Sequence, residues 1–234
     1  MICVTGNSSH LRCTLFPPLD LSPSHDWEMG FLDLMTYNSI PNVEENVNNK
    51  IKIGKRLEIK LPTGSYEIND INNFINNRLK EENAGVKFEL KANNNTLKSE
   101  LFCSEPIDFS EPDSIGTLLG FASVKEPLAA HKWHESPREV VINKVDIIRI
   151  TCNIVRGSYR DGVEGHVLHE FYPTVPPGYK IIEKVPTVKY LPINKQNVLN
   201  EFYINLEDQN GDLVNFRGEN INLRVDIRKR KRRD

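Results

Sequence analysis

The chain has few cysteines, and they are not arranged to hold a metal or a disulfide framework. The four cysteines among 234 residues, Cys3, Cys13, Cys103 and Cys152, are far apart and form no CxxC pair. Structural zinc sites and dense disulfide scaffolds need closer spacing. We therefore expect free thiols, mostly buried, and no metal site built on them.

Long apolar runs are also missing. No stretch approaches 18 uninterrupted apolar residues, so the sequence predicts no membrane-spanning helix and no membrane partner. The start of the chain, residues 1–6, lacks a basic region followed by an apolar block, so we expect no secretory signal and a reducing compartment. With 2 Trp, 7 Tyr and 10 Phe, the chain is too aromatic to be disordered.

The common catalytic motifs are absent. The sequence contains no GxxxxGK[ST], GxGxxG, HExxH or GxSxG, which are the signatures of phosphate-binding loops, zinc peptidases and nucleophile elbows. We predict no enzyme activity, no catalytic residues and no cofactor. A catalytic site assembled from distant residues stays open at this level.

Two HxxH pairs, His131/His134 and His166/His169, are the first candidates for a metal site. In an extended segment, residues three apart point to opposite faces, so neither pair could hold one ion unless it lay in a turn or helix. We therefore interpret them as solvent-facing or hydrogen-bonded histidines.

A second candidate resembles a calcium loop. Asp208, Asn210, Asp212 and Glu219 occupy positions 1, 3, 5 and 12 of such a loop, but Leu213 stands where glycine is needed. The flanking segments are strand-like instead of helical. We interpret this segment as the turn of a final hairpin and predict no metal site.

The net charge of −2 averages two dissimilar segments. Residues 228–234 carry six cations and one anion, whereas residues 1–227 hold 24 cations against 31 anions. Contiguous cations repel one another, so we expect a disordered tail that binds nucleic acid non-specifically or serves in nuclear import. The candidate residues for this site are Arg228, Lys229, Arg230, Lys231, Arg232 and Arg233.

Most segments of the chain alternate apolar and polar residues with period two, which is typical of half-buried strands. A hairpin is predicted over residues 86–103, around three consecutive asparagines, and a long strand over 145–155. Eight to ten strands are expected in all. The others include residues 51–53, 57–61, 202–206 and 221–227.

Only one segment has a helical period. Ile68, Ile71, Phe74, Ile75 and Leu79 form an apolar stripe of about three turns, with Ser65 as the expected cap. A shorter helix is predicted over residues 114–119. Many strands with long connections and at most two helices predict an all-β fold, a single jelly-roll β-sandwich with one or two short inserted helices. We expect the jelly-roll domain over 1–227 and the tail over 228–234.

Several segments together carry a family resemblance. They are residues 26–31, 36–43, 61–66, 114–121, 169–173, 176–179 and, most specifically, 208–219. Their order resembles that in the jelly-roll capsid proteins of Polinton (Maverick) elements and adintoviruses, most closely in their minor capsid, or penton, protein. Length favours the penton, because 234 residues hold one ordinary sandwich and not the two of a double jelly-roll major capsid protein.

The resemblance implies a structural capsid protein that assembles as homopentamers at the vertices of an icosahedral virion. Its implied partners are other copies of itself, the double jelly-roll major capsid protein and, through the tail, non-specific genomic DNA. Assembly would take place in the host nucleus or cytoplasm. Candidate subunit contacts are the loops around residues 43–49, 123–139 and 159–166.

Three alternatives remain at this level. The chain could be a fragment or relative of the major capsid protein, or a jelly-roll module that binds a receptor or glycan. A metal-dependent enzyme of the cupin kind would need two or three histidines and a carboxylate converging inside the barrel.

Overall fold

The computed structural model describes residues 1–22, 24–122, 124–142, 144–160 and 162–230. Their contacts divide the chain into two compact units, each with its own hydrophobic core. Unit 1 comprises Met1–Ile40 and Val145–Asp234, and unit 2 comprises Pro41–Lys144. The segment expected to form one domain, 1–227, thus contains two cores, and unit 2 is inserted into the chain of unit 1.

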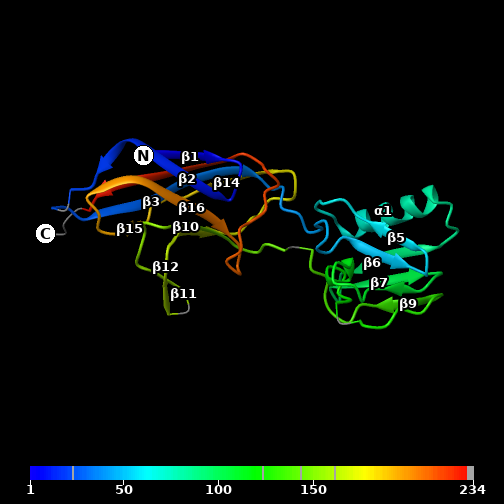
Figure 1. Ribbon diagram of the computed structural model, residues 1–234. Helices are drawn as coiled ribbons and strands as arrows, with labels where there is room; N and C mark the ends of the chain where they lie inside the picture. Colours follow the sequence, from blue (N-terminus) through cyan, green and yellow to red (C-terminus); the bar gives the residue numbers. More distant parts are fainter. Residues whose placement is uncertain (23, 123, 143, 161, 231–234) are drawn as a thin grey trace. The chain divides into compact units, whose positions relative to one another are not determined.

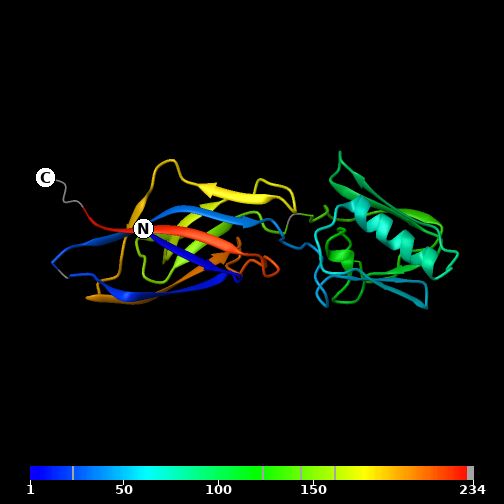
Figure 2. The same ribbon diagram turned by 90° about the horizontal axis from the view of Figure 1, so that it is seen from above.

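Unit 1 is built from two antiparallel sheets (Figures 1 and 2). In the first sheet the strand order is β1 (Ile2–Gly6), β17 (Ile221–Lys229), β3 (Trp27–Tyr37) and β14 (Lys180–Lys184). The short strand β15 (Tyr190–Pro192) pairs with the start of β3, beyond the part that pairs with β14. In the second sheet the order is β13 (Val167–Phe171), β10 (Ile148–Cys152), β16 (Val198–Glu207) and β2 (His10–Asp20).

The strand order identifies the fold. Numbered one to eight along the chain, without β15, the strands follow the order 1-8-3-6 in the first sheet and 5-4-7-2 in the second. Consecutive strands therefore lie mostly in opposite sheets, as two interlocked Greek keys require. The predicted all-β jelly roll is confirmed in unit 1.

The core of unit 1 follows from the period-two pattern of its strands. In β10, Ile148, Ile150 and Cys152 are buried, whereas Arg149 and Thr151 between them are partly exposed. The other strands add buried Leu, Ile, Val and Phe side chains, so the space between the sheets is filled by apolar side chains.

Two expectations for unit 1 need correction. The strand predicted over 145–155 is limited to β10, because the chain turns after Cys152, where the Val155 N–H bonds to the Cys152 carbonyl at 3.1 Å. The expected final hairpin is wrong as well: β16 and β17 lie in opposite sheets, and residues 208–219 connect the sheets. Alternation shows that a segment is a strand but not which strand it pairs with.

Unit 2 contains two small antiparallel sheets and a helix. One sheet has the order β5 (Leu57–Lys60), β4 (Lys50–Ile53), β8 (Ile107–Asp108), and the other β6 (Phe88–Asn93), β7 (Lys98–Cys103), β9 (Lys132–Glu135). The predicted hairpin over 86–103 is confirmed as β6 and β7. Seventeen strands are described in total, more than the eight to ten expected, and they include a hairpin of unit 1, β11 (Ser158–Arg160) and β12 (Val163–Gly165).

The predicted helices both lie in unit 2. Helix α1 (Ile68–Glu81) buries Ile68, Ile71, Ile75 and Leu79, as the stripe predicts. Its first turn is held by Asp70, whose carboxylate accepts the Glu67 N–H at 3.0 Å, so the predicted Ser65 cap is wrong. The shorter helix is a 3-10 turn, η1 (Ile115–Thr117). No helix among the described residues is long and apolar enough to cross a bilayer.

Candidate nucleic-acid interface

The first two cations of the basic segment are not part of a disordered tail. Strand β17 continues through Lys229, and its register places Arg228 opposite Glu28 and Lys229 opposite Trp27 on β3. The predicted tail boundary at residue 228 is therefore wrong. These two cations are therefore not free charges of a tail: the Glu28 carboxylate lies opposite Arg228, and the Trp27 ring lies opposite Lys229.

Arg228 is held in an ion pair and a ring contact. Its Nε donates to the Glu28 Oε1 at 2.7 Å, and its Cζ lies 3.3 Å from the centroid of the Tyr190 ring. The hydrogen bond to Glu28 raises the pKa of the Arg228 guanidinium. Glu28 is buried at 8% exposure, whereas Arg228 is exposed, and the ion pair neutralises the charge of Arg228 at the surface of unit 1.

The chain start closes the same region. The Met1 ammonium lies 2.9 Å from Asp226 Oδ1, and the Tyr190 hydroxyl donates to Asp226 Oδ2 at 3.1 Å. The hydrogen bond from the ammonium lowers the pKa of Asp226. Burial, together with the hydrogen bond to Asp226, raises the pKa of Tyr190. These contacts join β1, β15 and β17 at the end of the unit from which the basic segment leaves.

The next cation of the run, Arg230, lies at the edge of a pocket. Lys229 Nζ lies 5.6 Å from the centroid of the Trp27 ring, and the Arg230 N–H bonds to the Asp26 carbonyl at 2.8 Å. That bond fixes the backbone of Arg230 at the pocket edge. Lys231, Arg232 and Arg233 lie outside the described residues.

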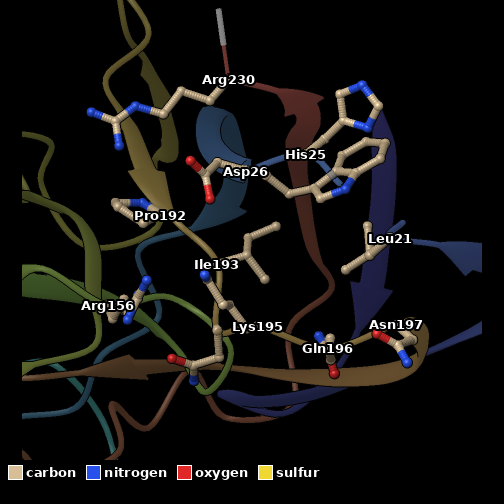
Figure 3. Close-up of a pocket in the computed structure, with 12 residues that line it drawn as sticks. Leu21, His25, Asp26, Arg156, Pro192, Ile193, Lys195, Gln196, Asn197 and Arg230 are labelled. Atoms are coloured by element: carbon tan, nitrogen blue, oxygen red, sulfur yellow. The ribbon is translucent and has the colours of Figure 1, made fainter. Parts of the chain in front are cut away.

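The pocket lies in unit 1 and has a volume of about 330 Å³ (Figure 3). Four segments that are distant in sequence build it: the end of β2 with the start of β3, the turn after β10, the β15–β16 connection, and the chain after β17. The residues lining it are Leu21, His25, Asp26, Trp27, Arg156, Pro192, Ile193, Asn194, Lys195, Gln196, Asn197 and Arg230.

Positive charge predominates in the pocket. Arg156, Lys195 and Arg230 face a single carboxylate, that of Asp26. Within the described part of the chain, none of the three cations forms an ion pair, and all are exposed. Figure 3 shows the side chains of Arg156 and Arg230 on one side of the pocket, with Leu21 and Asn197 opposite.

The pocket also contains apolar surface and an unpaired donor. Leu21 and Ile193 are buried, and Trp27 is half-buried with its Nε1 donating to the Ser22 carbonyl at 3.3 Å. The Nε2 of Gln196 is buried and has no acceptor among the described residues. An unsatisfied buried donor costs about 1–3 kcal/mol, so an acceptor supplied by a ligand would stabilise this amide.

The histidine pairs are engaged elsewhere. His134 Nε2 donates to the Ala129 carbonyl at 2.8 Å, and His166 Nδ1 donates to the Val155 carbonyl at 2.6 Å. His169 Nε2 lies 2.9 Å from Glu183 Oε1, and its ring stacks on Phe31 with centroids 4.5 Å apart. In the described ranges no three His, Cys, Asp or Glu residues converge as metal ligands would.

The calcium-like segment is a turn. Asp208 is buried, and its Oδ1 accepts the backbone N–H groups of Asn210, Gly211 and Asp212 at 2.8 to 3.0 Å. One oxygen of the carboxylate is thus used to close the loop between β16 and β17.

The sequence identified the basic segment but missed the pocket. Arg156 and Lys195 are isolated cations in the sequence, with no neighbouring charge run to single them out. A proline and several asparagines around Lys195 indicate only a loop. Their convergence with Arg230 depends on strand pairing across the whole of unit 1.

The fold and the site thus define a jelly-roll protein with a cationic pocket where its basic segment begins. No family model and no curated protein matches the chain. Among solved structures, the chain is similar to the selenomethionine-labelled mavirus penton protein, over 97% of this chain and 98% of that one, at 11% identity and a TM-score of 0.49.

Proposed function

We propose that this chain is a structural capsid subunit, the penton, five copies of which form a ring at each vertex of an icosahedral virion. The observation that carries the proposal is the jelly-roll strand order of unit 1, with unit 2 inserted between β3 and β10. Jelly rolls serve as capsid and lectin domains and as cupins. The segments that resemble Polinton and adintovirus pentons favour the capsid use.

A ring needs a contact in which two different surfaces of the subunit meet. The β11–β12 hairpin is a suitable surface, because it extends from the two sheets of unit 1 (Figure 1). It exposes two large apolar side chains, Tyr159 and Val163, each 70% exposed. Aromatic side chains are enriched in interface cores, so we assign this hairpin to the contact between subunits.

The other partners follow from the same assignment. A vertex protein in such a particle contacts the major capsid protein around it, and the basic segment faces the packaged genome. The virion is then the final location of the chain, and assembly precedes it in the host nucleus or cytoplasm. No catalytic activity belongs to this role.

Electron microscopy and light scattering of the purified protein test the proposal. We expect five-fold rings, and we expect the double variant Tyr159→Ser and Val163→Ser to be monomeric with an unchanged melting temperature. The matched control replaces Tyr172 and Val198, which are 66% and 48% exposed in the same unit, and it should keep the rings. A wild-type protein that stays monomeric and binds glycans would refute the capsid assignment in favour of a recognition module.

A further inference from the structure

We propose that the pocket of Arg156, Lys195 and Arg230 binds the phosphodiester backbone of nucleic acid. This inference rests on the proposed function, since it places the pocket on the genome side of the subunit. It replaces the expectation of a site made by the tail alone with a site in the folded unit, lined by described residues.

The charges of the pocket are available to a ligand, unlike those of several other arginines of unit 1. Arg12, Arg149 and Arg224 each pair with a carboxylate on a neighbouring strand. Arg156, Lys195 and Arg230 have no carboxylate partner in the described ranges. Positive charges that lie close together without counterions repel one another, and a bound anion offsets that repulsion.

The backbone that carries these cations is held in place. The Arg156 N–H bonds to the Pro192 carbonyl at 3.0 Å, and the Asn194 N–H bonds to the Ile154 carbonyl at 2.8 Å. With the Arg230 N–H bonded to the Asp26 carbonyl, all three segments are tied to neighbouring segments of unit 1. The backbone of these segments is already ordered before an anion binds, so binding costs less conformational entropy.

A repeated anion fits the site better than a single one. In the sequence, three further cations, Lys231, Arg232 and Arg233, directly follow Arg230. A phosphodiester backbone presents charges at regular spacing to such an array and releases counterions at each contact. The contacts are to phosphate, so the site binds without reading sequence.

The acid of the pocket gives an independent test. Asp26 lies among the three cations and repels an incoming phosphate. Replacing it by Asn keeps the size of the side chain and the backbone carbonyl that binds Arg230, and removes the charge. Asp26→Asn should therefore tighten nucleic-acid binding severalfold, an effect that a tail acting alone would not produce.

The main experiment measures anisotropy of a fluorescein-labelled DNA duplex against salt concentration, with the full chain and with the triple variant Arg156→Gln, Lys195→Gln, Arg230→Gln. Each lost phosphate contact lowers the slope of log K against log salt by about 0.9, or about eightfold in affinity at 0.1 M salt. We expect a loss between eightfold and roughly 500-fold for one to three contacts. The matched control replaces Lys55, Arg56 and Lys87, exposed cations of unit 2 without ion pairs in the described ranges, and should change little.

Three outcomes would overturn the inference. The first is equal losses in the triple variant and the control. The second is unchanged binding in the triple variant together with full loss on deleting Lys231–Asp234. The third is that a glutamate-rich peptide with the same total charge as the duplex displaces the duplex, and that this displacement depends on the same three cations. Ring formation is scored on the same samples, so rings without pocket-dependent binding refute the pocket alone, whereas binding without rings refutes the penton assignment.

Discussion

The replacement of Ile75 by Ala in helix α1 should destabilise unit 2 and leave unit 1 unchanged. Ile75 is fully buried in the core of unit 2, and no residue belongs to both cores. Three carbons are lost, worth about 0.8 kcal/mol each, and the cavity left behind raises the cost to about 3 kcal/mol, within the 2–5 kcal/mol range of such substitutions.

The two tryptophans make the units separately observable. Trp27 lies in β3 of unit 1, whereas Trp133 lies in β9 of unit 2, where its ring centroid is 5.6 Å from that of Phe102. Trp27→Phe and Trp133→Phe each leave one reporter. Urea titration then follows the unfolding of one unit at a time.

The expected shift is large. With a denaturant slope of about 1.5 kcal/mol per molar urea for a unit of this size, a loss of about 3 kcal/mol lowers the midpoint reported by Trp133 by about 2 M. The midpoint reported by Trp27 should stay in place. The control is Val47→Ala, an exposed site of unit 2 at 54% exposure, which should change either midpoint little.

A parallel shift of both midpoints would refute the reasoning. It would mean that the two cores unfold as one cooperative unit despite having no residue in common. A Trp27 midpoint that falls while the Trp133 midpoint stays would also contradict the assignment of Ile75 to the core of unit 2.

Three smaller predictions concern single groups. Burial raises the pKa of the Cys152 thiol to about 11, so at pH 8 a thiol reagent should label exposed Cys3 rapidly and Cys152 only after unfolding; equal rates would contradict the buried core. Because the hydrogen bond from the chain-start ammonium lowers the pKa of Asp226, its stabilisation is present above the unfolded pKa of about 3.9 and lost as the pH falls below it. Asp226→Asn should therefore reduce thermal stability more at pH 7 than at pH 2.5, and an equal loss at both would point to packing instead. Asp70→Ala removes the acceptor for the Glu67 N–H and should cost about 1 kcal/mol in the unfolding of unit 2, measured by the Trp133 transition, with Asp70→Asn as the milder control.

The secondary structure was largely predictable because its signals are local. Spacing alone predicts the helix stripe of Ile68, Ile71, Ile75 and Leu79, since one face of a helix repeats within a few residues. Alternation also predicts the strand around Ile148 and Ile150 but not its length, because the turn after Cys152 has no strong sequence signal. Boundaries depend on where a pairing partner ends, and that partner lies elsewhere in the chain.

The candidate site was predictable only in part. The run of cations was visible in the sequence, and Arg230 does line the pocket. The ion pair of Arg228 could not be predicted from the sequence, because its partner, the Glu28 carboxylate, lies 200 positions away. Arg156 and Lys195 were missed for the same reason.

The sequence by itself determined a β-rich chain with one amphipathic helix, no common catalytic motif and an uneven charge distribution, because composition and short-range periodicity encode these properties. Only the tertiary structure decided the strand order, the separation into two cores and the neutralisation of Arg228. It also decided which cations share a pocket. These features depend on which distant segments lie side by side, and burial against a partner strand, not local propensity, selects that arrangement.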